Sequence, residues 1–220
     1  MCGRFILTLD PVELQEAFDL GEFPLEWTPR YNIAPGQPIA VVDDLQTRKV
    51  GYMRWGLVPY WAKDRSIGNR LINARAETIA EKPSFRSAFT HRRCLILANG
   101  FYEWSKADKA GGRAAIPHLF ELRNGGPFAM AGLWESWRSP EGEMVKSCTI
   151  VTTNANEIVG RVHERMPVLF SPVSAWDWLE NRSPGDLLKL LQPYPPEMMV
   201  SHPVSQAVNN PKQDDPSVVL

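Results

Sequence analysis

The chain has 220 residues, of which 44% are hydrophobic and 22% charged, so it can bury the core of one large domain or two small ones. It contains no run of about 18 apolar residues and no charged-then-apolar leader, so we expect neither a membrane span nor a secretory signal and predict a cytoplasmic protein. Its three cysteines, an odd number without metal-ligand spacing, argue against a disulfide framework, and we predict no metal ion and no other cofactor.

The net charge of −1 conceals an uneven distribution of charge along the chain. Residues 46–100 carry eleven Lys and Arg against three Asp and Glu, a balance of +8, so the remainder carries −9. Such a basic stretch in a nearly neutral chain suits a protein that presents one basic face to an anion. The alternative is that folding scatters these cations over several faces.

In chain order, the first predicted element is a helix that begins at Asp10, with Pro11 in its first turn and Glu13 placed to complete a capping box. A proline-rich connection follows. Apolar runs then predict strands at 38–43, 49–55, 93–98, 117–122, 127–134 and 145–153. The sequence RNGG at 123–126 predicts a hairpin turn. Further helices are expected at 83–90, 172–180 and 184–192.

The arrangement of these elements predicts the fold class. The strands cluster in the middle of the chain without regular βαβ alternation. We therefore predict an α+β fold, a single domain built on a curved, largely antiparallel, barrel-like sheet with peripheral helices. The tail NNPKQDDPSVVL is polar and contains proline, so we expect it to run over the surface.

The cysteine at position 2 is open to two interpretations. Removal of Met1 requires a small second residue, and Cys2 qualifies; the processed chain would carry an α-amine and a thiol with reference pKa values of about 7.7–8.0 and about 8.5. The amine would form an imine with an aldehyde and the thiol would close a thiazolidine, or the thiolate would attack an amide with the amine as its base. The alternative is that Cys2 is an incidental residue before a strand.

Three polar side chains stand out in segments that otherwise resemble buried strands. Asn73 belongs to LINARAET, in which alternate positions share one face of an extended chain. Glu103 lies between two aromatic residues, which favours a raised pKa and a role in proton transfer. His163 is a candidate general acid or base near neutral pH. Taken singly, such groups are more often structural than catalytic, and we interpret the other histidines, at 91, 118 and 202, as surface or structural residues.

A segment rich in aromatic residues follows residue 53, and several basic residues lie within it and directly after it. RWGLVPYW (54–61) contains Trp55 and Trp61, and cations follow at 63, 65, 70 and 75. Aromatic faces beside arginines suit single-stranded nucleic acid, because bases stack on the rings and phosphates pair with guanidinium groups. The alternative is that both tryptophans belong to the core.

Seven segments carry a more specific signal: MCGRF (1–5), RYNIAPGQ (30–37), RWGLVPYW (54–61), INARAET (72–78), CLILANGFYEW (94–104), HERMPVLF (163–170) and HPVSQAVNN (202–210). Together they resemble the SRAP family, the SOS-response-associated peptidases or abasic-site processing proteins. The matches run in order from residue 2 to about residue 212, so the resemblance implies a single SRAP-like domain over 1–220, with a core of 2–212 and a C-terminal tail of 213–220.

The resemblance implies a function in the response to DNA damage. Family members recognise abasic sites in single-stranded DNA and cross-link to them through the N-terminal cysteine as a stable thiazolidine, which shields the lesion. By this resemblance Cys2 is the nucleophile and Asn73 helps to sense the abasic sugar. Glu103 and His163 stabilise and process it. The implied DNA-binding residues are Arg4, Trp55, Trp61 and Arg75.

The resemblance also sets expectations about partners and side reactions. The family name implies a peptidase activity, which fits self-removal of Met1 to expose Cys2. An imine that the thiol does not capture is open to β-elimination, so we expect a weak lyase activity. The expected partner is single-stranded DNA with abasic sites. We predict a monomer that associates with the nucleoid through DNA and not with a membrane.

Two other classes of protein remain open at this point. An N-terminal-cysteine glutamine amidotransferase also begins Met-Cys-Gly, and Asn99 and Gly100 would then supply its oxyanion hole. A non-catalytic module for binding single-stranded DNA would bind reversibly and would keep its affinity after Cys2→Ala.

Overall fold

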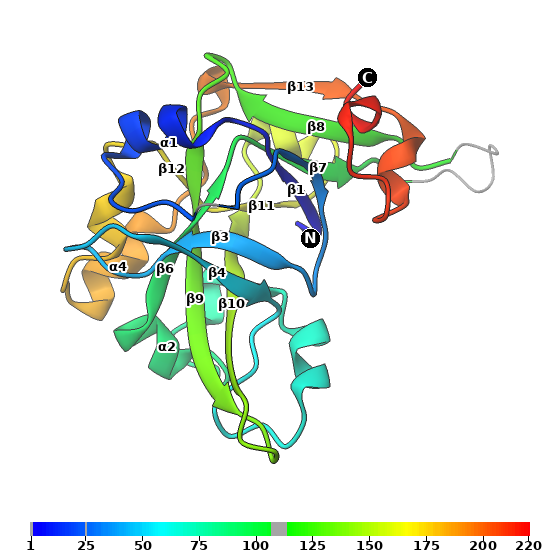
Figure 1. Ribbon diagram of the computed structural model, residues 1–220. Helices are drawn as coiled ribbons and strands as arrows, with labels where there is room; N and C mark the ends of the chain where they lie inside the picture. The colour runs from blue at the N-terminus through cyan, green and yellow to red at the C-terminus, as the bar shows by residue number, and fades with distance from the viewer. Residues whose placement is uncertain (1, 25, 107–113) are drawn as a thin grey trace.

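Two β-sheets organise the molecule in the computed structural model, which describes residues 2–24, 26–106 and 114–220 (Figure 1). The first sheet is antiparallel, in the order β13 (Met199–Pro203), β8 (Pro117–Leu122), β7 (Gly100–Trp104), β1 (Arg4–Leu7) and β2 (Arg30–Ile33). The second closes on itself through β10 (Met144–Asn154), β4 (Val50–Trp55), β3 (Pro38–Val42), β6 (Arg93–Ala98) and β9 (Phe128–Arg138). Three short strands extend this barrel: β5 (Asn73–Arg75) and β11 (Arg165–Pro167) pair with β10, and β12 (Leu169–Phe170) pairs with β9.

Short helices cover the outside of the sheets, and Figure 1 shows α1, α2 and α4 on the side of the barrel away from the N-terminus. The α-helices are α1 (Pro11–Phe18), α2 (Arg86–His91), α3 (Glu157–Gly160) and α4 (Pro184–Leu190). The 3₁₀ segments are η1 (Arg65–Arg70), η2 (Ala76–Thr78), η3 (Ala175–Trp178), η4 (Pro196–Met198), η5 (Gln206–Asn209) and η6 (Pro216–Val218). The predicted α+β class and the barrel-like, largely antiparallel sheet are confirmed.

The first helix forms as the sequence predicts, because its orphan amides are satisfied locally. The Asp10 carboxylate accepts hydrogen bonds from the amides of Val12 and Glu13 at 2.8 and 2.9 Å, and the Glu13 carboxylate accepts from the Asp10 amide at 3.2 Å. Such caps contribute about 1 kcal/mol each. The helix ends at Asp19, whose positive φ of 50° turns the chain away.

Apolar burial holds the two sheets together. The main core fills the barrel and the space between it and the first sheet, and Trp55 and Trp178 are its largest fully buried side chains. A smaller cluster packs Tyr102 and Leu119 of the first sheet against Val208 and Val218 of the C-terminal segment. Each sheet therefore has one face on the common core.

The predicted hairpin at 123–126 is wrong. The turn is present, with Gly125 at φ 70°, but the strands on either side do not pair. β8 pairs with β7 and β13 in the first sheet, whereas β9 belongs to the barrel. A turn sequence predicts a change of direction, and the partner of each strand is decided by distant segments.

Two other expectations need correction. The helix predicted at 172–180 is only the 3₁₀ segment Ala175–Trp178. The C-terminal tail is anchored and does not simply run over the surface: the Asp214 carboxylate accepts from the amides of Tyr31 and Asn32 at 2.5 and 2.8 Å, and Val218 is fully buried. The polar composition of the tail reflects hydrogen bonds to β2 as much as solvent exposure.

Candidate active site and nucleic-acid interface

The four residues predicted to carry chemistry come from segments that meet where the two sheets adjoin. Cys2 lies two residues before the start of β1, and Glu103 lies on β7, the neighbour of β1. Asn73 begins β5 and His163 precedes β11, and both of these strands pair with β10. The side-chain amide of Asn73 donates to the carbonyl oxygen of Cys2 at 2.8 Å, which fastens the start of the chain to the barrel.

The thiol of Cys2 is fully buried, with Sγ 3.9 Å from the carbonyl oxygen of Arg4. Burial raises the pKa of the thiol well above its usual range, and the negative charge of Glu103 raises it further. Cys2 is therefore a neutral thiol at neutral pH. It reacts as a nucleophile only when a neighbouring base accepts its proton.

Glu103 is the neighbouring residue whose carboxylate could accept the proton of the Cys2 thiol. It is 3% exposed, and burial raises the pKa of the carboxyl, while the neighbouring His163 opposes that rise. A carboxyl with a raised pKa exchanges protons closer to neutral pH than an ordinary glutamate does. Cys2, Glu103 and His163 thus form one electrostatically coupled group.

The imidazole of His163 is held in a defined orientation. The amide of Arg165 donates to Nδ1 at 3.0 Å, and the carbonyl oxygen of Arg165 lies 3.3 Å from the same nitrogen; the shorter bond favours the neutral tautomer with its hydrogen on Nε2. His163 is half-buried. The neutral ring is therefore able to donate through Nε2.

A bidentate ion pair supports the segment that carries His163. The guanidinium of Arg165 donates to the two carboxylate oxygens of Glu77 at 2.6 and 3.0 Å. It also donates to the carbonyl oxygen of Thr152 at 2.6 Å and to the side-chain oxygen of Asn154 at 3.0 Å. Arg165 is 9% exposed, so this charge is buried and paired. The pair joins η2 to β11 beside the group of Cys2, Glu103 and His163, the candidate catalytic group.

Sequence reasoning missed this ion pair. Two signals were available: Arg165 begins the apolar run RMPVLF, and Glu77 follows Asn73 at strand-like alternation. A cation in an apolar strand needs a partner, because an unpaired buried charge is strongly destabilising. No pattern in the sequence identifies which carboxylate supplies it.

The side-chain oxygen of Asn73, Oδ1, is a candidate for a contact with substrate. Oδ1 is buried and accepts no hydrogen bond from any residue that the structure describes. Leaving a buried acceptor unsatisfied costs about 1–3 kcal/mol. Oδ1 of Asn73, beside Cys2, therefore suits a hydroxyl or amine donor that arrives with the substrate.

The residues predicted to bind DNA occupy different environments. Trp61 and Arg75 are exposed. Trp55 is fully buried, packs edge-on against Phe5 and donates from its indole to a backbone carbonyl, so its ring has no exposed face for a base. The guanidinium of Arg4 is partly buried and donates to Asn32 and to the backbone of the C-terminal segment.

A close backbone contact shapes the exposed loop that carries Trp61. Gly56 has a φ of 124°, and a Cβ at this position would lie 2.7 Å from the carbonyl oxygen of Gly68. A Cβ on Gly68 would lie 2.6 Å from the carbonyl oxygen of Gly56. Both positions therefore require glycine, and their contact joins the beginning of the loop to η1.

The basic stretch at 46–100 does not form one continuous face. Arg48, Lys49 and Arg92 are ion-paired with nearby carboxylates. Arg93 donates to four backbone carbonyls and packs beside Trp178. The alternative interpretation, in which folding scatters these cations, holds for this part of the stretch. The cations of the 63–75 segment are the ones next to Trp61 and Asn73.

Asn99, which the amidotransferase interpretation places in an oxyanion hole, is hydrogen-bonded to Thr8 instead. The side chain of Asn99 accepts from the Thr8 amide at 2.8 Å and donates to the Thr8 hydroxyl at 2.9 Å. Thr8 lies six residues beyond Cys2, roughly 20 Å along an extended chain. Gly100 instead allows close packing, since a Cβ there would lie 2.9–3.0 Å from the side chains of Leu119 and Ile6.

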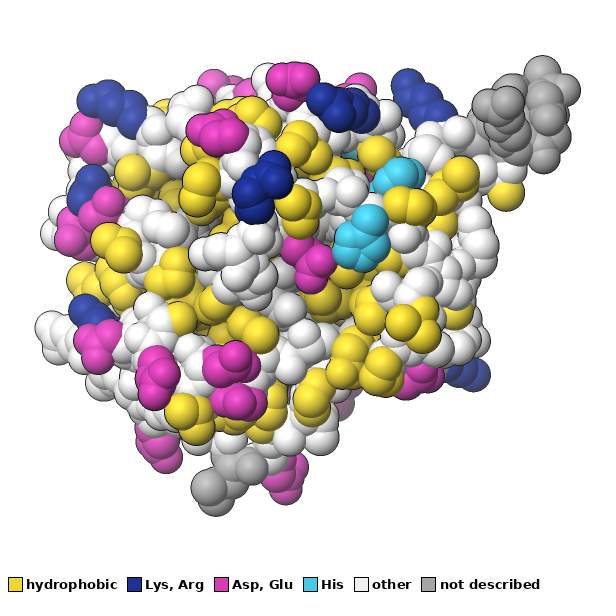
Figure 2. Space-filling view, turned by 90° about the horizontal axis from the view of Figure 1, so that it is seen from above, with side chains coloured by type: hydrophobic (Ala, Val, Ile, Leu, Met, Phe, Trp, Pro, Cys, Tyr) yellow, Lys and Arg dark blue, Asp and Glu magenta, His cyan; other side chains and the backbone are white. Residues whose placement is uncertain are grey.

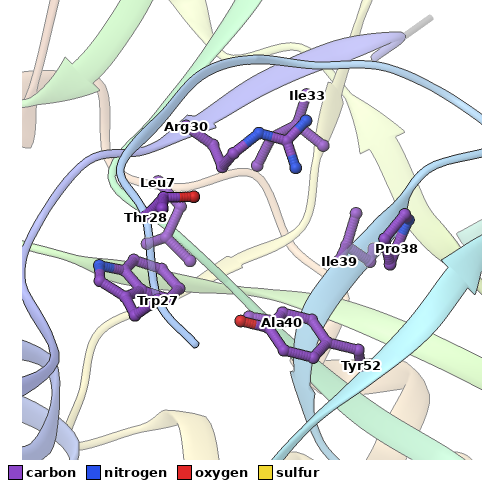
Figure 3. A pocket seen from close by; sticks show the side chains of 9 residues that line it. All are labelled: Leu7, Trp27, Thr28, Arg30, Ile33, Pro38, Ile39, Ala40 and Tyr52. Carbon is purple, nitrogen blue, oxygen red and sulfur yellow. The ribbon is translucent and has the colours of Figure 1, made fainter. Parts of the chain in front are cut away.

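A hollow elsewhere in the molecule is separate from this group. Figure 3 shows it between Trp27 and Tyr52, with Leu7 and Ile39 among its apolar walls and Arg30 at its edge. It adjoins the far end of β1, five residues beyond Cys2. It contributes no residue to the catalytic group.

No three His, Cys, Asp or Glu side chains among residues 2–24, 26–106 and 114–220 are grouped in a way that would hold a metal ion. No helix in these ranges has the length and apolar character needed to cross a membrane.

The molecule is therefore an α+β barrel in which the buried thiol of the second residue interacts with a buried carboxyl, and that carboxyl interacts with an imidazole. A family model described as SOS response associated peptidase (SRAP) matches residues 1–211. The chain belongs to this family.

Named relatives extend the comparison. The chain is similar to the abasic site processing protein YoqW of Bacillus subtilis (strain 168), with 42% identity over 224 residues that cover 100% of this chain and 99% of YoqW. It is 31% identical over 231 residues to the abasic site processing protein HMCES of Rattus norvegicus, covering 88% of this chain and 65% of HMCES. A crystal structure of a Bordetella bronchiseptica protein superimposes with a TM-score of 0.78 at 25% identity, covering 93% of this chain and all of that one.

Proposed function

We propose that this protein recognises abasic sites in single-stranded DNA and forms a covalent cross-link with them through Cys2 after removal of Met1. The observation that carries the proposal is the coupled group of Cys2, Glu103 and His163, with Asn73 holding the Cys2 backbone and offering an unsatisfied acceptor. The names of its relatives support the substrate, since YoqW and HMCES are both abasic site processing proteins.

The first chemical step is opening of the abasic sugar. The lesion is mostly a closed hemiacetal, so a proton must reach the ring oxygen while another leaves the hydroxyl. His163 supplies the proton to the ring oxygen from Nε2, and the proton of the C1′ hydroxyl passes to a water molecule. Oδ1 of Asn73 accepts a hydrogen bond from a sugar hydroxyl. The product is an aldehyde at C1′.

The second step joins the aldehyde to the processed N-terminus. The α-amine of Cys2 adds to the aldehyde carbon, and the carbinolamine loses water to give an imine, with Glu103 moving the protons. The thiol then adds across the C=N bond: a C–S bond forms, and the thiol proton passes through Glu103 to the nitrogen. The net product is a thiazolidine and one water molecule. Because burial keeps the thiol protonated, this relay through a neighbouring carboxyl is needed.

Removal of Met1 is a precondition, because an acylated nitrogen cannot form an imine. Met1 itself lies outside the described residues. We propose that the chain hydrolyses its own Met1–Cys2 bond, with water consumed and Glu103 as the base. Mass spectrometry of Glu103→Gln made in cells that lack methionine aminopeptidase activity on this sequence, or translated in vitro without that enzyme, tests this step. Retention of Met1 by the variant and loss by the wild type is expected, and equal loss by both contradicts it.

DNA contacts are proposed for the exposed members of the predicted set. Trp61 offers a ring to a base, and Arg75, on the strand that begins with Asn73, faces a phosphate. Trp55 and Arg4, which are buried and partly buried, stabilise the segments of the interface and do not contact the DNA bases. Binding is then sensitive to salt and indifferent to base sequence.

The test is a denaturing gel. The protein is incubated with single-stranded DNA that contains one abasic site, boiled in detergent and compared with an oligonucleotide without the lesion. We expect a shifted band that requires both the lesion and a free N-terminal Cys2. Cys2→Ala, which keeps the α-amine, should give no heat-stable adduct but should cleave the strand slowly by β-elimination. A band that persists with an N-terminal tag left in place would refute the mechanism.

The same experiment separates the competing interpretations. Reversible binding that survives Cys2→Ala, without any adduct from the wild type, would identify a non-catalytic binding module. Release of ammonia from glutamine by the purified protein would identify an amidohydrolase. The engagement of Asn99 with Thr8 makes that second outcome the less expected one.

A further inference from the structure

A groove adjoins the catalytic group on the side of β8 and β13, and we call it the β8–α3 groove. Its lining includes Ile158, Arg161 and Val162 from α3 and the residues after it, Met199 from β13, and His118 and Arg123 from the two ends of β8. None of the residues that line it is acidic. Figure 2 shows the molecule from the side of β13, where histidine side chains lie among hydrophobic ones.

One end of the groove borders the catalytic group. His118 is directly opposite Glu103 in the pairing of β7 with β8, so the two side chains share a face of the sheet. Val162 immediately precedes His163. From His118 the lining continues along β13, from Pro203, which pairs with His118, to Met199, which pairs with Leu122 beside Arg123; these four steps span roughly 13 Å of strand. That length suits a segment of polymer rather than one small molecule.

The chemistry of the groove suits a nucleotide. Ile158, Val162 and Met199 offer an apolar wall, and the imidazole of His118 offers a ring. Burial, and then the neighbouring His202, lower the pKa of His118, so the ring is neutral and stacks as an aromatic surface at neutral pH. Bases bind to such walls without regard to their identity.

Two arginines at the rim are available to phosphates. The guanidinium of Arg123 donates to the carbonyl oxygens of Glu197 and Met199 at 2.9 and 3.2 Å, which holds it in place beside the groove. Arg161 pairs with Glu157 at 3.0 Å, but both side chains are at least 70% exposed. An exposed pair of this kind contributes little, so exchange of the carboxylate for a phosphate is easy.

An abasic site inside a strand has a nucleotide on each side, and both need a path away from Cys2. The loop that carries Trp61 leads directly into Asn73 and supplies one path. We propose that the β8–α3 groove supplies the other: it holds the nucleotides that adjoin the lesion on one side, with bases against its apolar wall and phosphates at Arg123 and Arg161. This inference rests on the proposed function, since it assumes that the lesion lies at Cys2.

The test uses reversible binding, so that it does not depend on the covalent chemistry. Two single-stranded oligonucleotides carry a tetrahydrofuran analogue of the abasic site, which has no aldehyde; one has the analogue next to its 5′ end and the other next to its 3′ end. Each therefore has nucleotides on one side only. Fluorescence anisotropy measures the affinity and salt dependence of the wild type and of the double variant Arg123→Ala/Arg161→Ala. The matched control is Arg182→Ala, which removes an arginine from a surface ion-pair cluster with Asp177 and Glu180.

We expect the double variant to lose roughly tenfold in affinity for one oligonucleotide and nothing for the other, with the slope of log K against log salt falling by roughly 1.4 for two phosphate contacts. Arg182→Ala should match the wild type on both. Equal losses on both oligonucleotides, no loss on either, or no binding by the wild type would overturn the proposal. Binding of the analogue without adduct formation on a true abasic site would instead refute the proposed function and leave the groove standing.

Discussion

Replacement of Glu77 by glutamine tests the view that its ion pair with Arg165 supports His163, the proposed proton donor. The variant loses the carboxylate that accepts two hydrogen bonds at 2.6 and 3.0 Å, while Arg165 keeps its bonds to Thr152 and Asn154. Breaking a fully buried pair costs about 3–5 kcal/mol. The Glu77 side chain is 46% exposed, so water replaces part of the interaction. We expect a loss of about 2 kcal/mol in the free energy of unfolding, or roughly 4–8 °C in Tm.

The effect has a defined dependence on pH. The hydrogen bonds from Arg165 hold the pKa of Glu77 below its usual range in the folded state. The stabilisation is therefore fully present above the unfolded-state pKa of about 4.3 and is lost as the pH falls through the lower folded-state value. The difference between wild type and Glu77→Gln should be complete at neutral pH and should shrink below about pH 4.

Urea unfolding across this pH range measures the difference, and the cross-linking rate measures its consequence for His163. The matched control is Glu22→Gln, because Glu22 pairs with Lys49 at 2.5 Å in an exposed setting outside the proposed DNA path. It should change the stability by less than about 0.5 kcal/mol and leave the rate unchanged. A Glu77 variant as stable as this control at neutral pH, or a difference that persists in acid, would show that the reasoning is wrong.

Three further predictions follow from burial and charge. Burial raises the pKa of Glu103, so its ionised form opposes folding; that opposition is absent at low pH and grows as the pH rises through the raised value. Glu103→Gln should therefore raise Tm at neutral pH while it slows cross-linking at every pH, because the proposed proton relay is lost, and a lowered Tm would contradict this. Trp61→Ala should leave Tm within a degree or two but weaken single-stranded DNA binding by about 1–3 kcal/mol. Trp55→Ala should instead lower the free energy of unfolding in urea by about 3–5 kcal/mol. Equal effects of the two variants on stability would refute the assignment of Trp61 to the surface and Trp55 to the core. Deletion of 213–220 removes Asp214 from β2 and should lower the unfolding free energy by about 3 kcal/mol or more, and an unchanged urea midpoint would show that the tail is dispensable.

Structure that depends on only a few neighbouring residues could be predicted from the sequence. Asp10, Pro11 and Glu13 together specify where the first helix begins, and the apolar runs indicate where strands lie. Trp55 and Trp61, six residues apart in one motif, show the limit: the motif indicates that both matter, but only one ring reaches the surface. Exposure depends on which other strands cover a residue, and local pattern does not contain that information.

The α+β class, the family and the candidate catalytic residues could be predicted from the sequence, because residue type and local periodicity are properties of short segments. The three-dimensional fold places Cys2, Glu103 and His163 in one electrostatic environment and lets Asn73 fasten the start of the chain. It also separated β8 from β9, although a turn joins them. These relations depend on pairing between strands far apart in the chain, and such pairing is settled by the burial of the whole core rather than by any one segment.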